Sequence, residues 1–265
     1  MIKAGGERLI AELDKLCNQV WREGQIVTEW TRSVLITIPK KGDLAKCNNY
    51  RTISLMNHMS KVLMSVLLER LKAQMETRLS EEQAGFRINR STVHQILILR
   101  LPAEKAKHKG RLIYNCFVNF RKAFDSINHG VTRAVFKSYG VGTTLIQLLQ
   151  KLGETAVSAV RVDRKLGDLF STTAGTRQGD PISPTVFISY LERLMDTIQN
   201  NDTGVSVQGC RINNLKVADD IDLLEESQSQ LQDNVTRLHE AEEAAGLHMK
   251  CHEYRQDKND GDGEC

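Results

Sequence analysis

The stretch that decides the fold is Lys216-Val217-Ala218-Asp219-Asp220-Ile221-Asp222-Leu223-Leu224. Its adjacent aspartates predict a tight hairpin, and Ile221 to Leu224 predicts a strand. Upstream, residues 205–217 predict a hairpin around Asn213-Asn214. The carboxylates of Asp219 and Asp220 would present hard oxygen ligands for a divalent cation on a short, stiff loop. On its own the pair is a weak signal, because surface turns are rich in aspartate.

Two further segments carry residues that suit the same chemistry. The first follows a buried strand predicted for residues 112–120 and reads Phe117-Val118-Asn119-Phe120-Arg121-Lys122-Ala123-Phe124-Asp125. The second reads Gly175-Thr176-Arg177-Gln178-Gly179-Asp180-Pro181-Ile182-Ser183-Pro184. Nucleotidyl transfer needs two divalent ions clamped by carboxylates, one to lower the pKa of a 3′-hydroxyl and one to neutralise the triphosphate leaving group. Helices and strands are intermixed along the chain, which indicates an α+β fold.

The composition excludes several classes of protein. No apolar run approaches the ~20 residues that cross a bilayer. The N-terminal stretch is amphipathic and carries acids, unlike a secretory signal. The six cysteines form no CxxC pair and are spread over the chain, which favours free thiols over disulfides or zinc. We therefore expect a nuclear or cytoplasmic protein that is neither secreted nor bound in a membrane.

The net charge of +3 hides two halves of opposite sign. Residues 31–111 contain 16 Lys and Arg against 6 Asp and Glu, whereas residues 175–265 contain 8 against 18. A basic half suits a phosphate backbone and an acidic half suits divalent metals, which is the combination that a polymerase needs. Charge alone leaves open the alternative of an ordinary solvated surface.

The order and spacing of the segments resemble the reverse transcriptases of non-LTR (LINE-type) retrotransposons, most closely the RTE-like branch. The resemblance covers roughly residues 5–250. Besides the three segments above, it rests on Trp30-Thr31-Arg32-Ser33, Ile38-Pro39-Lys40-Lys41-Gly42-Asp43, Asn49-Tyr50-Arg51-Thr52-Ile53-Ser54-Leu55, Glu82-Gln83-Ala84-Gly85-Phe86-Arg87 with Arg90-Ser91-Thr92, and Gly246-Leu247. So many motifs in one order leave little room for chance.

The resemblance implies a right-hand polymerase with fingers and palm, in which a small antiparallel palm sheet packs on helices. The expected division is an N-terminal helical extension of the fingers at 1–30, basic fingers at 31–111, a palm with the metal site at 112–250 and a disordered tail at 251–265. We expect neither a thumb nor an endonuclease domain, so the chain would be a fragment of the element's product.

The resemblance also implies the roles of individual residues. Two Mg²⁺ ions, with Mn²⁺ as a substitute, would be held at the catalytic positions Asp219, Asp220 and Asn119. Among the substrate-binding residues, Arg51 would contact the incoming deoxynucleoside triphosphate, and Phe124 would exclude a 2′-hydroxyl. The segment Arg177-Gln178-Gly179 would lie beside the nascent base pair. The template backbone would be contacted by Lys40, Lys41, Arg87 and Arg90. The partners would be an RNA template and a DNA primer, without a membrane; the sequence does not indicate an oligomeric state.

Several positions depart from the family pattern. The first metal ligand should be an aspartate, but this chain has Asn119, whose amide oxygen carries no negative charge. Val217 stands where the family usually has Tyr, and Asp180 where it commonly has Cys. The segment from Met249 onwards matches poorly and could be unrelated sequence. Three interpretations stay open: an impaired reverse transcriptase, a non-catalytic RNA-binding remnant, and the product of a decayed element.

Overall fold

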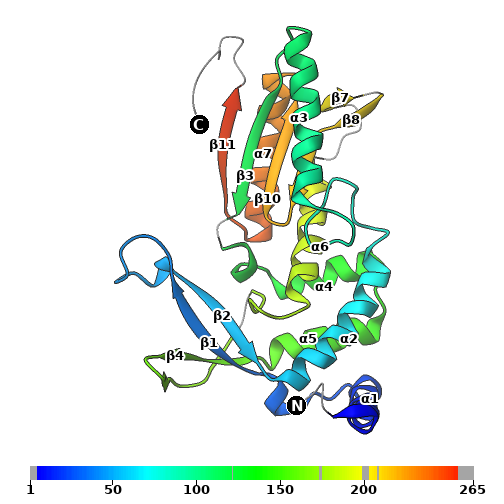
Figure 1. Cartoon of the computed structure of the whole chain (residues 1–265), viewed down its shortest axis with the longest axis vertical. Coiled ribbons are helices and arrows are strands. Elements are labelled where there is room, and N and C mark those ends of the chain that lie inside the picture. The colour runs from blue at the N-terminus through cyan, green and yellow to red at the C-terminus, as the bar shows by residue number, and fades with distance from the viewer. Residues whose placement is uncertain (1–4, 121, 173–174, 199–202, 208, 256–265) are drawn as a thin grey trace. The chain divides into compact units, whose positions relative to one another are not determined.

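The described chain forms two compact units, each assembled from two separate segments (Figure 1). The computed structural model describes residues 5–120, 122–172, 175–198, 203–207 and 209–255, of which 48, 207 and 251–255 are described by their backbone alone. The first unit comprises Met1–Arg78 and His129–Ser183, and the second comprises Leu79–Asn128 and Pro184–Cys265. The functional boundaries expected from the sequence, with fingers at 31–111 and palm at 112–250, stay a prediction.

The helices of the first unit are α1 Gly6–Glu23, α2 His58–Met75, α4 His129–Ser138 and α5 Thr143–Glu154, with short 3₁₀ turns at Thr28–Trp30 and Cys47–Asn49. Helix α2 shows why this sequence is helical. Leu63, Leu67, Leu71 and Met75 recur every four residues on one face, and all four are buried. Asn57 caps the helix, because its side-chain oxygen accepts a hydrogen bond from the Met59 N–H at 2.8 Å.

The strands of the first unit are β1 Arg32–Pro39, β2 Tyr50–Met56, β4 Val157–Val162, β5 Lys165–Leu166 and β6 Phe170–Ser171. They form one sheet in the order β2-β1-β4-β5, with β6 also paired to β4. Strand β1 runs antiparallel to β2 and parallel to β4. A buried hydrogen bond of 2.9 Å joins the hydroxyls of Ser33 and Ser158 across the parallel pair. The hairpin of β1 and β2 therefore has a fixed register against the rest of the unit.

The second unit is built on a four-stranded antiparallel sheet in the order β11-β3-β10-β9. Its strands are β3 Tyr114–Phe120, β9 Asn214–Val217, β10 Asp220–Glu225 and β11 Met249–Arg255, and a separate hairpin pairs β7 Val205–Val207 with β8 Cys210–Ile212. The central strands are β3 and β10, which lie about a hundred residues apart in the sequence. This sheet confirms the small antiparallel palm sheet expected from the sequence.

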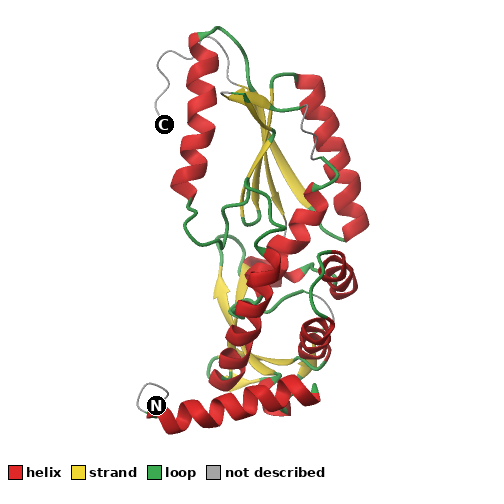
Figure 2. Cartoon of the chain, turned by 90° about the vertical axis from the view of Figure 1, so that its right-hand side faces the viewer, coloured by secondary structure: helices red, strands yellow, loops and turns green. Residues whose placement is uncertain are grey.

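Helices lie on both faces of this sheet (Figure 2). They are α3 Thr92–His108, α6 Ser183–Met195 and α7 Gln228–Ala245, with a 3₁₀ turn at Ala123–Asp125. Helix α7 packs against β3 and β10, where it buries Leu231 and Leu238. Helix α3 packs against β9 and covers a cluster that includes Leu215 and Leu224. The expected α+β class, with a sheet packed on helices, is confirmed.

Two expectations about the C-terminal half were wrong. The chain does not turn at Asn213-Asn214; the turns lie between β7 and β8 and at Ala218-Asp219, between β9 and β10. Gly209, with φ of +89°, supplies the positive φ that the first of these turns needs, whereas Asn214 begins a strand. The tail expected to be disordered from residue 251 instead continues β11 as far as Arg255, because the backbone groups of β3 pair with it. Residues 256–265 lie outside the described residues.

None of the described helices combines the length and the apolar character that a bilayer-crossing segment requires.

Candidate active site

A two-residue loop joins β9 to β10, and the adjacent aspartates lie at the end of this loop and the start of β10. Val217 pairs with Asp220, so Ala218 and Asp219 form the loop. Ala218 has φ of +60°, while Asp219 does not have a positive φ. A positive φ at the first loop position alone is the arrangement of a type II′ hairpin turn, where glycine is usual. Ala218 therefore holds a conformation that its own side chain disfavours, and surrounding contacts must stabilise it.

Asn119 lies directly opposite Asp220 on the neighbouring strand. The two residues are register partners in the antiparallel pair of β3 and β10. The Asn119 side-chain Nδ2 donates a hydrogen bond of 2.6 Å to the Asp220 Oδ1. Both side chains are exposed, and Asp219 is half-buried. The sheet thus brings residue 119 to the aspartate pair, although the two segments are 101 residues apart.

The donor set at this turn suits a divalent cation only in part. Asp219 and Asp220 offer carboxylate oxygens, which hard cations such as Mg²⁺ prefer. Asn119 instead directs an N–H group at one of these oxygens, and an N–H group cannot be a ligand. Among the described residues, no three His, Cys, Asp or Glu side chains group closely enough to hold a metal ion. The turn therefore offers two anionic ligands, Asp219 and Asp220, whereas two divalent cations would need a larger number of anionic ligands.

A second carboxylate on the same strand, that of Asp222, is buried. Asp222 lies two residues beyond Asp220 and is 7% exposed. Burial raises the pKa of Asp222 to about 7, and the nearby Asn115 amide opposes that rise. Within the described part of the chain, neither Asp222 oxygen accepts a hydrogen bond of ordinary geometry. The carboxyl group is consequently a source of instability at pH values where it is charged.

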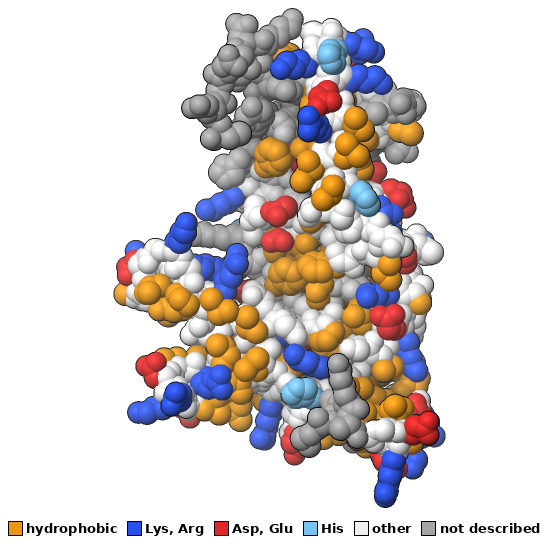
Figure 3. All heavy atoms as spheres, in the orientation of Figure 1, with side chains coloured by type: hydrophobic (Ala, Val, Ile, Leu, Met, Phe, Trp, Pro, Cys, Tyr) orange, Lys and Arg blue, Asp and Glu red, His pale blue; other side chains and the backbone are white. Residues whose placement is uncertain are grey.

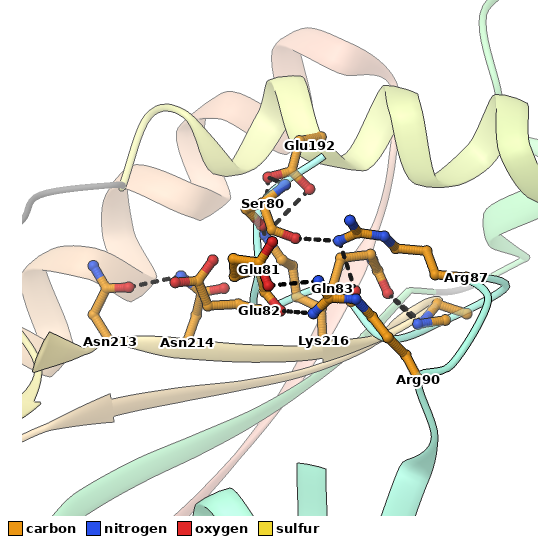
Figure 4. A network of polar contacts seen from close by, with 12 residues as sticks. Ser80, Glu81, Glu82, Gln83, Arg87, Arg90, Glu192, Asn213, Asn214 and Lys216 are labelled. Carbon is orange, nitrogen blue, oxygen red and sulfur yellow. Dashed lines mark hydrogen bonds and ion pairs between the residues drawn. The ribbon is translucent and has the colours of Figure 1, made fainter. Parts of the chain in front are cut away.

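A buried ion pair anchors the strand that leads into the turn. The Lys216 Nζ lies 3.2 Å from the Glu192 Oε1 and donates to the Ser80 Oγ at 2.8 Å. The Ser80 N–H donates to the same Glu192 oxygen at 3.2 Å. Lys216 is fully buried and Glu192 is 2% exposed. Figure 4 shows Lys216 of β9 reaching towards Ser80 and Glu192, so strand, loop and helix α6 meet at one charged contact.

The loop that follows Ser80 pairs with β9 as a short parallel extension. The Lys216 N–H donates to the Glu82 carbonyl at 3.0 Å, and the Ala84 N–H donates to the Lys216 carbonyl at 2.9 Å. Two arginines close the loop: the Arg87 Nη1 donates to the Ser80 carbonyl at 2.6 Å, and Arg90 donates to the Glu81 carbonyl and carboxylate. Both guanidinium groups thus bond within the loop, and a template contact by Arg87 or Arg90 stays a prediction.

Phe124 stacks within the second unit. Its ring centroid lies 4.8 Å from that of Phe187, and the rings are tilted by 32°. Phe187 is fully buried in α6 and Phe124 is half-buried. Aromatic pairs at this separation stabilise each other and fix the ring position. If Phe124 excludes a 2′-hydroxyl, as we expect from the sequence, its ring is held in place for that role by packing on Phe187.

In the first unit, Arg177, Gln178 and Gly179 form a tight turn against β2. The Ser54 N–H donates to the Gln178 carbonyl at 2.7 Å. Gly179 has φ of +107°, and a Cβ there would lie 2.9 Å from the Ser54 carbonyl oxygen, so only glycine fits without strain. Arg177 is paired with Asp180, their closest side-chain atoms being 3.5 Å apart. Burial lowers the pKa of Arg177 and raises that of Asp180, and the attraction between the two opposes both shifts.

The hairpin of β1 and β2 carries the other residues selected from the sequence. Arg51 lies on β2 opposite Ile38 of β1, and its side chain is exposed. Lys40 and Lys41 follow the end of β1 and are exposed too. Lys and Arg side chains gather over this hairpin, together with exposed apolar ones (Figure 3). The hairpin is thus an accessible basic surface of the first unit.

Comparisons with known proteins show the family of this chain. The family model for reverse transcriptase (RNA-dependent DNA polymerase) matches residues 38–254. The Pol polyprotein from the type-1 retrotransposable element R2 of Popillia japonica is 28% identical over 212 residues, which cover 77% of this chain and 29% of that protein. The RNA-directed DNA polymerase from the mobile element jockey of Drosophila funebris is 28% identical over 217 residues, covering 79% of this chain and 23% of that protein.

The fold has solved counterparts as well. One is a telomerase from Candida tropicalis, solved in complex with a fragment of telomeric RNA. The match has a TM-score of 0.64 and covers 94% of this chain and 45% of the telomerase chain. Its sequence is 13% identical, so this likeness concerns the fold alone. It agrees with the polymerase fingers and palm expected from the sequence.

The family model covers most of the chain, so the chain belongs to the reverse transcriptase family. Within the family it is a reverse transcriptase domain of the non-LTR retrotransposon kind, like its R2 and jockey relatives. It spans less than a third of the length of these two relatives. The finer placement in the RTE-like branch stays a prediction. Because the family match runs to residue 254, the interpretation of the segment from Met249 onwards as unrelated sequence is wrong for residues 249–254.

Sequence reasoning missed two groups of residues that support the turn. The first is the buried pair of Lys216 and Glu192. The strand pattern alone predicts that Lys216 is exposed. The second is Gln83 with Gly85, which were recognised as part of a motif without a role. A charged residue inside an otherwise apolar strand and a glutamate within the apolar run of α6 were the available signals.

Proposed function

We propose that this chain is an RNA-directed DNA polymerase domain whose nucleotidyl transfer is impaired at one position. The observation that carries the proposal is the hydrogen bond from Asn119 to Asp220, at the position where the family places a carboxylate. Asp219 and Asp220 would hold the cation. When bound, Mg²⁺ or Mn²⁺ would lower the pKa of the primer 3′-hydroxyl and neutralise charge on the triphosphate. Because Asn119 contributes an amide instead of a carboxylate, less negative charge is available to hold the cation, and we expect Mg²⁺ to occupy the site weakly.

The substrates that we propose are an RNA template, a DNA primer and deoxynucleoside triphosphates. In the first unit, Arg51 would donate its planar fork to a triphosphate, and Gln178 and Gly179 would lie along the nascent base pair. Arg177 would act by holding that turn through Asp180. In the second unit, Phe124 would select deoxynucleotides.

The template-contacting residues of the proposal fall into two groups. Lys40 and Lys41 would bind the template backbone directly, because their ammonium groups are exposed. Arg87 and Arg90 would instead keep their loop in shape, since their guanidinium groups bond within it. A non-catalytic RNA-binding module is the second candidate function. It rests on the same Asn119 contact together with the basic surface of the β1–β2 hairpin.

Primer extension on an RNA template tests the proposal. Four chains are compared: the unmodified protein, Asn119→Asp, Asp220→Asn, and the exchanged pair Asn119→Asp/Asp220→Asn. Asn119→Asp should raise single-nucleotide incorporation, and Mn²⁺ should partly rescue the unmodified chain, because Mn²⁺ binds mixed ligand sets more readily. The exchanged pair keeps one carboxylate and one amide, so it should stay as slow as the unmodified chain.

The same assay separates the two candidate functions. Incorporation by the unmodified chain with Mg²⁺ alone, at about 1–10³ per second, would show that Asn119 does not impair it. Salt-sensitive RNA binding without incorporation by any variant or with either metal would favour the RNA-binding module.

A further inference from the structure

The N–H group of Ala218 has a specific partner outside the hairpin. The Gln83 side-chain Oε1 accepts a hydrogen bond from the Ala218 N–H at 3.1 Å. The same oxygen accepts a second hydrogen bond, from the Gly85 N–H at 2.7 Å. Gln83 is fully buried. One side-chain oxygen therefore ties the residue with the disfavoured φ to the loop that runs beside β9.

Gly85 brings this loop into direct contact with the turn. A Cβ added at Gly85 would lie 2.2 Å from the backbone nitrogen of Ala218 and 2.8 Å from its Cα. Any side chain at residue 85 would therefore push the turn away. The parallel bridge between Gln83 and Lys216 keeps the loop in register beside the strand. The turn is thus supported from one side by backbone as well as by the Gln83 oxygen.

The nitrogen of the Gln83 side-chain amide indicates why glutamine, and not an apolar residue, stands at this position. Among the described residues, the Gln83 Nε2 has no hydrogen-bond partner although it is buried. A buried donor without a partner costs free energy that an apolar side chain of similar size would avoid. Packing alone therefore does not account for glutamine at this position. What glutamine adds over leucine is an acceptor for two backbone N–H groups.

We infer that Gln83 is a positioning residue of the Asp219–Asp220 turn, acting through the Ala218 N–H. This inference rests on the proposed function, in which the turn presents both carboxylates to a divalent cation. Gln83 fixes the backbone from which the carboxylates project, and groups that orient metal ligands commonly affect metal affinity. Without its oxygen, Ala218 is free to relax from the left-handed region, which rotates the peptide that carries Asp219.

Mn²⁺ affinity tests the inference in the full chain carrying Asn119→Asp. Mn²⁺ binding is followed by the electron paramagnetic resonance of the free ion. Gln83→Leu should raise the Kd for Mn²⁺ about 10–100-fold, and Gln83→Glu, which keeps an acceptor in place, should restore most of the affinity. The control is Asn234→Leu, which breaks a buried hydrogen bond of 2.7 Å to Glu225 at the far end of β10. Equal increases in Kd for Gln83→Leu and Asn234→Leu, or none for Gln83→Leu, would overturn the inference.

Amide hydrogen exchange gives a readout that does not depend on metal or on a variant that folds. In the unmodified chain, the Ala218 and Gly85 amides should exchange slowly because Gln83 accepts both, and fast exchange of Ala218 would overturn the inference. Absence of Mn²⁺ binding by Asn119→Asp with Gln83 intact would count against the proposed function instead. Slow exchange of Ala218 that becomes fast in Gln83→Leu would then still support the positioning role.

Discussion

Lys216→Met should destabilise the second unit strongly. The substitution leaves the Glu192 carboxylate 2% exposed and without its cation, with the Ser80 N–H as a remaining donor. Removing one partner of a buried ion pair costs about 3–5 kcal/mol, because the other charge stays desolvated. Lys216→Met/Glu192→Gln removes both charges and keeps an acceptor for Ser80. This double variant should recover most of the loss, giving a coupling of at least about 2 kcal/mol.

The assay is urea unfolding followed by far-ultraviolet circular dichroism, because Trp21 and Trp30 both lie in the first unit and would not report on β9. The matched control is the exposed pair of Arg193, which lies on α6 like Glu192, and Asp196, which follows the end of that helix; their side-chain atoms lie 3.1 Å apart. Arg193→Met should cost no more than about 1 kcal/mol. A loss below about 1 kcal/mol for Lys216→Met, or additive effects in the double variant, would refute the reasoning.

Three further predictions use other parts of the chain. Asp222 has an unfolded-state pKa of 3.8 and a folded-state pKa of about 7, so the folded state is stabilised by its proton. The free energy of unfolding should fall as pH rises through this range, by about 4 kcal/mol in all and by about 2.5 kcal/mol between pH 5 and 8. Asp222→Asn should remove this fall in urea titrations at pH 5 and 8, and an equal fall in both proteins would contradict the assignment. Asn119→Asp should lower the free energy of unfolding without metal by about 1 kcal/mol, the repulsion of two charges 4 Å apart in water. MgCl₂ should restore thermal stability in that variant but not in the unmodified chain, and equal responses would count against a cation site. Lys40→Glu/Lys41→Glu should reduce the salt dependence of RNA binding by about 0.7 per lost phosphate contact, whereas Lys15→Glu on α1 should leave it unchanged in filter binding.

The family and the position of the turn could be predicted because they depend on local signals in a fixed order. Adjacent aspartates between two short apolar runs predict a hairpin. The order of the motifs predicts that Asn119 lies beside them, and in the structure Asn119 donates a hydrogen bond to Asp220. The hairpin around Asn213 was mistaken because asparagine pairs suit turns, yet Gly209 and Ala218 supply the positive φ values instead.

The supporting contacts could not be predicted, because they depend on tertiary packing. Lys216 alternates with apolar residues on β9 and looks exposed in sequence. Only the packing of α6 brings Glu192 to it. The loop contacts of Arg87 could not be predicted either, because its guanidinium bonds to carbonyl groups in its own loop. Carbonyl partners leave no trace in sequence, since every residue has one.

The strand order of the second unit also constrains how the chain can fold during synthesis. Strand β3 is a central strand, yet its neighbour β10 begins 100 residues after β3 ends, and its other neighbour, β11, begins 129 residues after it. At synthesis rates of about 5–20 residues per second, β3 waits roughly 5–20 s with both edges unpaired. Unpaired strand edges are templates for association with other chains. The arrangement that brings residue 119 to the aspartate pair therefore also leaves the nascent chain vulnerable to aggregation until β10 emerges.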